Sequence, residues 1–299
     1  MKVKLEGIWT PMVTPFTPDG KVDDKMARTL VDHLIENGVD GLFPCGTTGE
    51  FPLLTAEERN SMIGAVVEGA NGRVPVAAGV ADPSVENVIR FAASAKDAGA
   101  DAVVATTPYY FTTTEEGIYE HFKFLAGKIE LPILLYNIPE WTHLFAPTRV
   151  VTRLAREGLI AGMKYTQYDF FRLLDFLTEL KGTIPVFNGS DAMTYTNLEF
   201  GGSGGVIAVS NIAPKLASSL FDEFRKGNLD RARGIQLKLL PLIRAISVGQ
   251  FPAGVKEALK MLGMDVGRTK DPVPSLLPAE RRVLRDFLVQ GGLLKDSKR

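Results

Sequence analysis

The sequence predicts a (β/α)8 barrel of the TIM type with helices added at its C-terminal end. Two observations predict this α/β fold: eight short apolar segments alternate with longer amphipathic stretches, and only helical patterns follow the eighth segment. Eight is the number of strands that closes such a barrel. A doubly wound open sheet shows the same alternation, but no Gly-x-Gly-x-x-Gly motif follows the first segment. We therefore favour the barrel.

The expected strands are short, apolar and bounded by turn-forming residues. They lie at residues 7–13, 41–44, 74–79, 102–106, 132–136, 160–164, 184–187 and 205–209. Amphipathic helices are expected between them, among others at residues 23–37, 55–68, 84–98 and 114–128. Several of these begin with a Thr, Ser or Asp suited to an N-cap, and Thr55 with Glu58 has the pattern of a capping box.

Beyond the eighth strand the pattern is helical throughout. Helices are expected at residues 214–226, 229–246, 252–262 and 278–290. No Pro/Ser-rich linker or low-complexity tract interrupts the chain. We therefore expect a catalytic barrel over residues 1–226 and a C-terminal helical bundle over residues 227–299.

Composition and charge narrow the class of protein. The chain of 299 residues has 45% hydrophobic and 23% charged residues, as ordinary soluble globular proteins do. A net charge of -1 gives no reason to expect a nucleic-acid partner, because phosphate binding needs concentrated Lys and Arg. No apolar run approaches the roughly 18 to 20 residues that span a bilayer, and the first residues lack the apolar core of a secretory signal. We expect a cytoplasmic protein without a membrane partner.

The single cysteine, Cys45, excludes an internal disulfide and fits a reducing compartment. It directly precedes a Gly-Thr-Thr turn, so a nucleophilic role has to be weighed. No histidine lies near it in the sequence, and a buried cysteine more often packs as a small hydrophobic residue. We expect a packing role.

Lys164 is the residue that most directly suggests chemistry. It follows the apolar run 159–163 at the end of the predicted sixth strand. Burial at such a place disfavours the ammonium and pushes the amine toward its neutral form, which is a nucleophile for carbonyl groups. A Schiff base with a keto acid is the hypothesis that follows. The alternative is a lysine whose stem covers apolar surface while its charge stays in water.

Other predicted strand ends carry groups that fit the same chemistry, and in a barrel all strand ends meet at one mouth. The loop Gly46-Thr47-Thr48-Gly49-Glu50 follows the second strand, and its backbone N–H groups and Thr hydroxyls can hold a carboxylate. Tyr136 ends the fifth strand and can transfer protons during imine formation. A core position for Tyr136 and a plain turn for the loop are the alternatives. Their combination with Lys164 favours the functional interpretation.

The three histidines do not suggest a metal site. His33, His121 and His143 are scattered, without a His-x-x-x-His motif or clustered carboxylates. A metal-dependent aldolase is therefore disfavoured. The expected electron sink is the imine itself, so we expect no metal and no cofactor beyond the covalent imine on Lys164.

Two further clusters are expected to have structural roles. Gly201-Gly202-Ser203-Gly204-Gly205 precedes a predicted strand rather than a helix, which favours a tight helix-to-strand connection over a phosphate-binding loop. The aromatic residues Tyr168, Phe170 and Phe171 are expected to pack in the core or at the rim of the barrel.

These residues together resemble the dihydrodipicolinate synthase and N-acetylneuraminate lyase superfamily of class I pyruvate-dependent lyases, over nearly the whole chain. The motifs that carry the resemblance are, in chain order, Gly46-Thr47-Thr48-Gly49-Glu50, Thr107-Pro108-Tyr109-Tyr110, Tyr136-Asn137-Ile138-Pro139, Gly162-Met163-Lys164-Tyr165, Asn188-Gly189-Ser190-Asp191 and Val255-Lys256-Glu257-Ala258-Leu259. The resemblance implies a (β/α)8 barrel with a C-terminal helical bundle. It also implies a homotetramer built from two tight dimers, with a small keto acid and an aldehyde as partners.

The resemblance assigns roles residue by residue. Lys164 matches the Schiff-base lysine, and Tyr136 matches the tyrosine that transfers protons. The loop that binds the substrate carboxylate corresponds to Gly46, Thr47 and Thr48.

Two more positions are assigned in the same way. Tyr110 matches a tyrosine that in the synthase branch reaches into the neighbouring subunit's site, so the resemblance implies a catalytic role for it. Ile207, expected on the last strand, matches a position whose backbone carbonyl faces the lysine pocket.

One position departs from the synthase pattern. In the synthases the Tyr-Asn-x-Pro motif continues with an arginine, two residues after the proline, that binds the carboxylate of aspartate semialdehyde. Here that position is Trp141, and an aromatic ring cannot make the bidentate contact that a carboxylate prefers. With Thr142 after it, Trp141 makes this stretch more similar to archaeal 2-keto-3-deoxygluconate aldolases. We expect Trp141 to contact the substrate.

These inferences favour a class I aldolase of carbohydrate metabolism. It would reversibly cleave 2-keto-3-deoxygluconate-type sugar acids to pyruvate and an aldehyde such as glyceraldehyde. A first alternative is a 4-hydroxy-tetrahydrodipicolinate synthase that joins pyruvate to aspartate semialdehyde. A second alternative, from another class, is a keto-acid-binding barrel without turnover, because a fold alone does not establish an activity.

Overall fold

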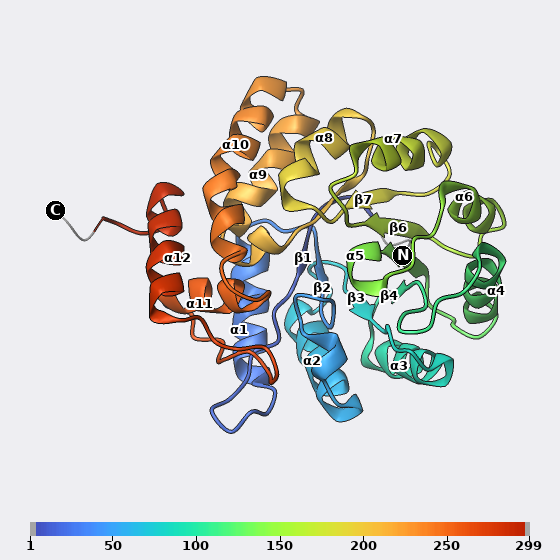
Figure 1. Cartoon of the computed structure of the whole chain (residues 1–299), viewed down its shortest axis with the longest axis horizontal. Helices are drawn as coiled ribbons and strands as arrows, with labels where there is room; N and C mark the ends of the chain where they lie inside the picture. Colours follow the sequence, from blue (N-terminus) through green and yellow to red (C-terminus); the bar gives the residue numbers. More distant parts are fainter. Residues whose placement is uncertain (1–3, 297–299) are drawn as a thin grey trace.

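An eight-stranded parallel barrel forms the centre of the computed structural model, which describes residues 4–296 (Figure 1). Its strands are β1 (Gly7–Pro11), β2 (Gly41–Phe43), β3 (Ala77–Gly79), β4 (Ala102–Thr106), β5 (Ile133–Asn137), β6 (Gly162–Tyr165), β7 (Val186–Asn188) and β8 (Gly204–Val206). Neighbouring strands follow the order β2-β1-β8-β7-β6-β5-β4-β3, and a parallel bridge between Leu42 and Val76 joins the two ends. The predicted barrel is confirmed.

Helices alternate with the strands and then continue alone. They are α1 (Asp24–Glu36), α2 (Ala56–Ala70), α3 (Val85–Ala98), α4 (Glu115–Ala126), α5 (Pro139–Thr142), α6 (Thr148–Arg156), α7 (Phe170–Glu179), α8 (Thr194–Glu199), α9 (Pro214–Arg225), α10 (Leu229–Ile246), α11 (Ala253–Met261) and α12 (Pro278–Gln290), with short 3-10 turns η1 (Phe51–Leu53), η2 (Asp191–Met193) and η3 (Ala208–Asn211). The predicted capping box is present, since the Thr55 hydroxyl accepts from the Glu58 N–H and the Glu58 carboxylate accepts from the Thr55 N–H. None of the helices in residues 4–296 combines the length and apolarity needed to cross a membrane.

The largest error in the predicted strands is at the last one. The expected strand 205–209 ends at Val206, and the next residues turn into η3. Side chains explain the turn, because the Ser210 hydroxyl donates to the Ile207 carbonyl and the Asn211 amide donates to the Ala208 carbonyl. Ile207, predicted on the strand, therefore lies one residue beyond it.

The alternation of side chains along the strands decides what faces the inside of the barrel. Tyr136 on β5 is paired in register with Lys164 on β6, and Lys164 with Phe187 on β7, so the three side chains project to the same side. Tyr136 and Phe187 belong to the apolar cluster that fills the barrel. The next residue, Tyr165, points outward and packs against Phe176 on α7. The register therefore puts Lys164 inside the barrel.

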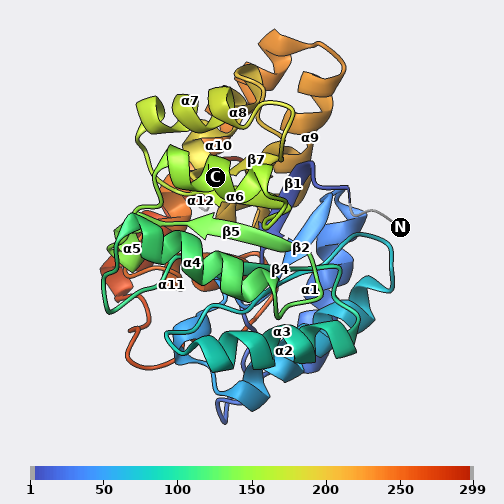
Figure 2. The ribbon, with the colours of Figure 1, turned by 90° about the vertical axis from the view of Figure 1, so that its right-hand side faces the viewer.

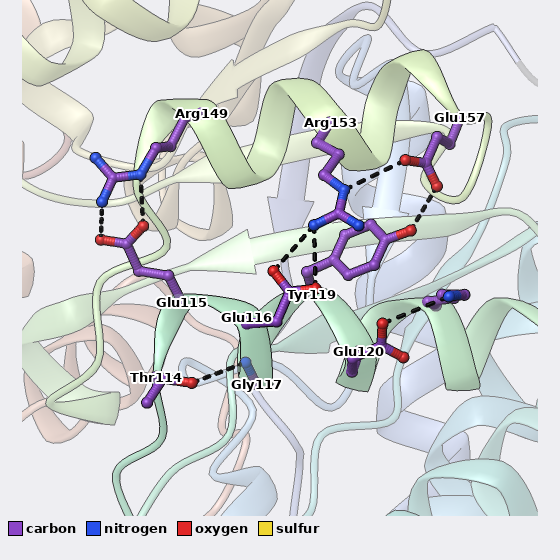
Figure 3. Close-up of polar contacts among 10 residues, drawn as sticks. Thr114, Glu115, Glu116, Gly117, Tyr119, Glu120, Arg149, Arg153 and Glu157 are labelled. Atoms are coloured by element: carbon purple, nitrogen blue, oxygen red, sulfur yellow. Dashed lines mark hydrogen bonds and ion pairs between the residues drawn. The ribbon is translucent and has the colours of Figure 1, made fainter.

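Charged side chains connect α4 with α6 on the outside of the barrel (Figure 3). Arg149 binds Glu115 through two nitrogens, and Arg153 binds both oxygens of Glu116. Glu157 accepts from the Tyr119 hydroxyl at 2.6 Å. The charged side chains are exposed, and exposed ion pairs contribute little to stability. They fix the relative position of two neighbouring helices rather than the core.

The helices after the barrel pack on one side of it. Figure 1 shows α10, α11 and α12 (orange to red) on the side of α1, away from α4 and α6. α10 packs against both α9 and α12. The view turned by 90° shows α2 and α3 side by side on one flank, with α9 and α10 at the other end (Figure 2). The division of the chain at residue 226 stays a prediction.

The glycine cluster before β8 is a tight helix-to-strand connection, as predicted. α8 ends at Glu199 and β8 begins at Gly204. A Cβ at Gly204 would lie 1.9 Å from the carbonyl oxygen of Gly7 on the neighbouring strand. The two backbones can therefore approach this closely because residue 204 is glycine.

Because of this contact, one methyl group added at Gly204 should lower the stability strongly. We expect Gly204→Ala to lower the free energy of unfolding by about 3 kcal/mol or more, because the clash is with backbone that has to shift. Gly234→Ala is the matched control. It lies inside α10 with no heavy atom within 4 Å of a new Cβ, so it should be neutral or stabilising by roughly 0.5 to 1 kcal/mol. Chemical denaturation measures both, and equal stabilities of the two variants would contradict the assignment.

Candidate active site

A cavity of about 230 Å³ lies at the carboxyl ends of the barrel strands. Residues from β1, β5, β6 and β8 line it together with the loops after β2, β6 and β7. Its outer wall comes from the C-terminal helices, since Ile243, Ile246, Ser247 and Phe251 line it as well. The helices after the barrel are therefore part of the site, which the sequence patterns did not reveal.

Lys164 reaches into this cavity from β6. Its residue surface is 5% exposed, and Nζ lies 4.2 Å from the ring centroid of Tyr136 and 5.2 Å from that of Phe43. Within residues 4–296 no carboxylate lies at ion-pair distance from this amine. The amine is thus held between two aromatic rings at the end of an open cavity, where a carbonyl compound could reach it.

Gly189 makes room for the lysine. A Cβ there would lie 2.6 Å from Cε of Lys164 and 1.9 Å from Oγ1 of Thr166. The Thr166 hydroxyl is buried and lacks a hydrogen-bond partner in the part of the chain that the structure describes. A buried hydroxyl without a partner beside a reactive amine is suited to hydrogen-bond a substrate. Gly189 and Thr166 were not predicted as site residues.

Tyr136 and the loop after β2 face each other across the cavity. The Tyr136 hydroxyl lies 3.4 Å from the Thr47 hydroxyl, close enough for a weak hydrogen bond that a bound substrate could shorten. The loop is a tight turn, in which the Gly49 N–H donates to the Gly46 carbonyl and the Glu50 N–H to the Thr47 carbonyl. Among residues 4–296 nothing accepts from the N–H groups of Thr47 and Thr48. They are available to a carboxylate.

Asp191 is a second ionisable group in the cavity wall. One of its carboxylate oxygens accepts from the Val209 N–H at 2.6 Å, and its backbone carbonyl accepts from Gln236 of α10 at 3.1 Å. Burial raises the pKa of Asp191 to about 6, although backbone hydrogen bonds and the charge of Lys164 oppose the shift. The sequence motif Asn188-Gly189-Ser190-Asp191 was the signal that could have pointed to it.

The structure brings most of the predicted residues together. Lys164, Tyr136, Thr47, Thr48 and Trp141 all line the cavity. Gly46, the first residue of the loop, lies against the ring of Phe43, which a Cβ would meet at 2.8 Å.

Besides Gly46, two predicted residues do not line the cavity within one chain. Tyr110 is 84% exposed, and its ring packs edge-on against Phe111. Ile207 is fully buried, and its carbonyl accepts the Ser210 hydroxyl at 2.5 Å. The carbonyl therefore already has a hydrogen-bond donor, and the strand position expected for Ile207 was wrong.

The aromatic residues after β6 lie at the rim. Tyr168 lines the cavity, and Phe171 and Tyr168 are largely exposed. Phe170 contacts Phe200 edge-on. Packing in the core or at the rim was expected for these aromatic residues; the rim is confirmed and the core is wrong.

Cys45 has the packing role that the sequence predicted. It is 1% exposed, and burial raises the pKa of its thiol to about 12. A thiol with such a pKa is protonated at neutral pH and is a poor nucleophile. Cys45 therefore supports the loop that follows it.

The charges of the cavity bear on its substrate. Within residues 4–296 the only Lys or Arg that lines it is Lys164, whereas Glu140 and Asp191 are acidic. Trp141, on the short helix α5 and half exposed, lines both this cavity and a neighbouring apolar cavity of about 310 Å³. In the same residues no group of three or more His, Cys, Asp and Glu side chains is placed to hold a metal ion.

Comparison with known proteins gives a consistent result. The model of the dihydrodipicolinate synthetase family matches residues 4–290. The 4-hydroxy-tetrahydrodipicolinate synthase of Methanococcus maripaludis strain C6 is 37% identical over 97% of this chain and 100% of its own length. The solved dihydrodipicolinate synthase of Thermotoga maritima has a TM-score of 0.93 at 32% identity, covering 97% of this chain and all of that one.

A further solved structure contains the keto acid itself. YagE, a prophage protein of E. coli K12 in the dihydrodipicolinic acid synthase family, was solved in complex with pyruvate. It has a TM-score of 0.93 at 31% identity, covering 97% of this chain and 99% of that one.

The space at Gly189 predicts a loss of reactivity without a loss of fold. We expect Gly189→Ala to displace the Lys164 side chain and to slow imine formation with pyruvate by about 100-fold, because misplacing a reactive group by about 1 Å has effects of this size. Gly64→Ala on α2, where a new Cβ meets no atom within 4 Å, is the control. Borohydride trapping measures the rate, and wild-type reactivity of a folded Gly189→Ala protein would contradict the assignment.

The pKa of Asp191 predicts a pH-dependent difference in stability. Because the folded pKa is raised above the unfolded value, the aspartate contributes stability below about pH 4 that is lost as the pH rises through about 6. Asp191→Asn does not titrate. We therefore expect its stability relative to wild type to increase by about 1–3 kcal/mol between pH 4 and pH 8. Denaturant titrations at both pH values test this, and a constant difference would show that the pKa of Asp191 is not raised in the folded protein.

Proposed function

The chain belongs to the dihydrodipicolinate synthetase family, and on this basis we propose that Lys164 forms an imine with pyruvate in the cavity at the mouth of the barrel. As a member of this family it is an aldolase-type carbon–carbon lyase that uses pyruvate. The observation that carries the assignment is the position of the Lys164 amine, which lies between two aromatic rings near the end of β6 and faces the Thr47–Tyr136 contact.

The chemistry uses groups already in place. The Lys164 amine adds to C2 of pyruvate and water leaves, which gives a protonated imine that draws electrons from C3. Loss of a C3 proton gives an enamine, and its C3 attacks the aldehyde carbon while the aldehyde oxygen takes a proton. Tyr136 is placed to supply that proton, and Thr47 is placed to relay it. The N–H groups of Thr47 and Thr48 hold the pyruvate carboxylate.

For the second substrate, the relatives favour aspartate semialdehyde. The archaeal relative that is 37% identical over its full length is named a 4-hydroxy-tetrahydrodipicolinate synthase, as is one from Syntrophus aciditrophicus at 35% identity. The proposal is therefore that the chain condenses pyruvate with aspartate semialdehyde. The interpretation from sequence, which favoured a 2-keto-3-deoxygluconate aldolase, takes second place because these relatives do not support it.

One observation keeps the sugar-acid reaction as a second candidate. Trp141 stands where the resemblance places an arginine that binds the semialdehyde carboxylate, and within residues 4–296 no cation other than Lys164 lines the cavity. A neutral aldehyde such as glyceraldehyde needs no such cation, so this geometry favours cleavage of 2-keto-3-deoxy sugar acids.

The assembly is also a proposal. Exposed Tyr110 and Phe111 lie on the loop after β4, and a partner subunit that covered them would bury both rings. This supports the homotetramer implied by the resemblance, in which Tyr110 would enter a neighbouring site.

The comparison of two aldehydes tests the reaction. We expect kcat/KM with pyruvate and aspartate semialdehyde to exceed that for glyceraldehyde by at least about 100-fold, because a site that hydrogen-bonds a polar group of its substrate discriminates this strongly against an aldehyde that lacks it. Lys164→Ala should abolish both reactions while the protein stays folded. A preference for glyceraldehyde would move the assignment to the sugar-acid aldolase, and pyruvate binding without any turnover would move it to a non-catalytic barrel.

A further inference from the structure

A buried ion pair connects the loop after β2 with the C-terminal helices. Nζ of Lys256, on α11, lies 2.6 Å from Oε1 of Glu50, the last residue of the loop, and the two side chains are 3% and 0% exposed. The ammonium also donates to the Arg268 carbonyl at 3.0 Å and lies 4.2 Å from the ring centroid of Phe16. The pair therefore joins three segments that are far apart in the sequence.

The other oxygen of Glu50 is held as well. Oε2 accepts from the Lys270 N–H at 2.7 Å, while the Lys270 side chain is paired with Glu58 on α2. Glu50 itself has a left-handed backbone conformation, with φ of 59°, which is unusual for a residue other than glycine. The carboxylate thus fixes a backbone shape that the chain does not favour by itself.

This shape determines where the carboxylate-binding groups point. The Glu50 N–H donates to the Thr47 carbonyl, and the Gly49 carbonyl accepts from the Thr14 hydroxyl at 2.7 Å. Thr47 and Thr48 directly precede Gly49 and Glu50, so a change at Glu50 is transmitted to them over two or three residues. In contrast, neither Glu50 nor Lys256 lines the cavity that contains Lys164.

Stability alone is a poor explanation of such a pair. The cost of removing two charges from water offsets most of their attraction, and apolar replacements of similar volume are often as stable. What an ion pair provides beyond stability is direction, since it holds two segments in one relative position. Here those segments are the loop and α11.

We propose that Glu50 and Lys256 are positioning residues for pyruvate: their ion pair holds the Gly46-Thr47-Thr48-Gly49-Glu50 loop in the shape that binds the substrate carboxylate, and so makes α11 part of substrate binding. This inference rests on the proposed function, because it requires pyruvate to bind at Thr47 and Thr48. Neither residue touches the substrate.

The ion pair should also respond to pH. Burial lowers the pKa of Lys256 to about 8, while the charge of Glu50 opposes the shift. The charged groups on the segments around it are Glu50 on the loop, Lys270 paired with Glu58, Arg268 paired with Asp271, and Arg281 of α12 paired with Glu257; η3 has none. Above about pH 8 the lysine loses its proton, which leaves Glu50 buried without its partner. An arginine at this position would stay charged.

The test measures how tightly pyruvate occupies Lys164. The labelled fraction of the full-length protein is determined by intact mass after borohydride reduction, over a range of pyruvate concentrations. We expect Lys256→Met to raise the half-saturating concentration by about tenfold or more at pH 7, with the maximal labelled fraction unchanged, because truncating one partner of a buried pair leaves the other unpaired. Glu50→Gln, which keeps an acceptor for the Lys270 N–H, should act in the same direction.

Two further variants separate positioning from general stability. Lys260→Met removes an exposed ion pair with Asp265, one turn further along the same helix, and should leave half-saturation unchanged. Lys256→Arg keeps the positive charge, so its half-saturating pyruvate concentration at pH 7 should equal that of the wild type. We expect the half-saturating concentration of the wild type to rise between pH 7.5 and pH 9. That of Lys256→Arg should stay constant over the same range.

The outcomes are distinguishable. A folded Lys256→Met or Glu50→Gln protein with wild-type half-saturation would overturn the inference, and so would identical pH profiles of wild type and Lys256→Arg. If Lys256→Met and Glu50→Gln do not fold, the pH dependence of the half-saturating concentration, compared between the wild type and Lys256→Arg, still tests the inference. Absence of any pyruvate adduct on the wild type would instead overturn the proposed function, and the inference with it.

Discussion

The parallel pairing of β5 with β6 is the constraint on which the site depends. It sets Lys164 beside Tyr136 at one level of the barrel, with Phe187 next in the same row. A shift by one residue would turn Lys164 outward and bring Tyr165 inside, because side chains alternate along a strand. The apolar packing of Tyr165 against Phe176 on the outside and of Phe187 on the inside both oppose that shift. The core of the barrel therefore fixes the position of the reactive amine.

Barrel residues and the C-terminal helices both shape the cavity around the Lys164 amine. Gly189 leaves the space that its side chain occupies, and the loop at Thr47 faces it from the other side of the cavity. The wall above comes from α10 and Phe251, and the loop is tied to α11 through Glu50 and Lys256. The C-terminal helices therefore complete a site whose proposed reacting groups all come from the barrel.

Much of this could be predicted from the sequence, because it depends on local patterns. Alternating strand and helix periods predicted the barrel, and the position of Lys164 at a strand end pointed to the residue that we propose to be reactive. The remainder depends on contacts between distant segments. Nothing near Asp191 in the sequence shows that α10 holds its backbone through Gln236, and nothing near Glu50 shows that Lys256 lies opposite. Ile207 was misplaced because the side chains of Ser210 and Asn211 end β8 early.

The central claim is that pyruvate is covalently bound at Lys164 with its carboxylate at Thr47 and Thr48. A crystal structure of the protein soaked with pyruvate tests it most directly. The claim predicts continuous density from Nζ of Lys164 to C2 of pyruvate, with the carboxylate at the N–H groups of Thr47 and Thr48 and the Tyr136 hydroxyl within hydrogen-bond distance of the adduct. Pyruvate attached to another lysine, or bound with its carboxylate away from that loop, would contradict it.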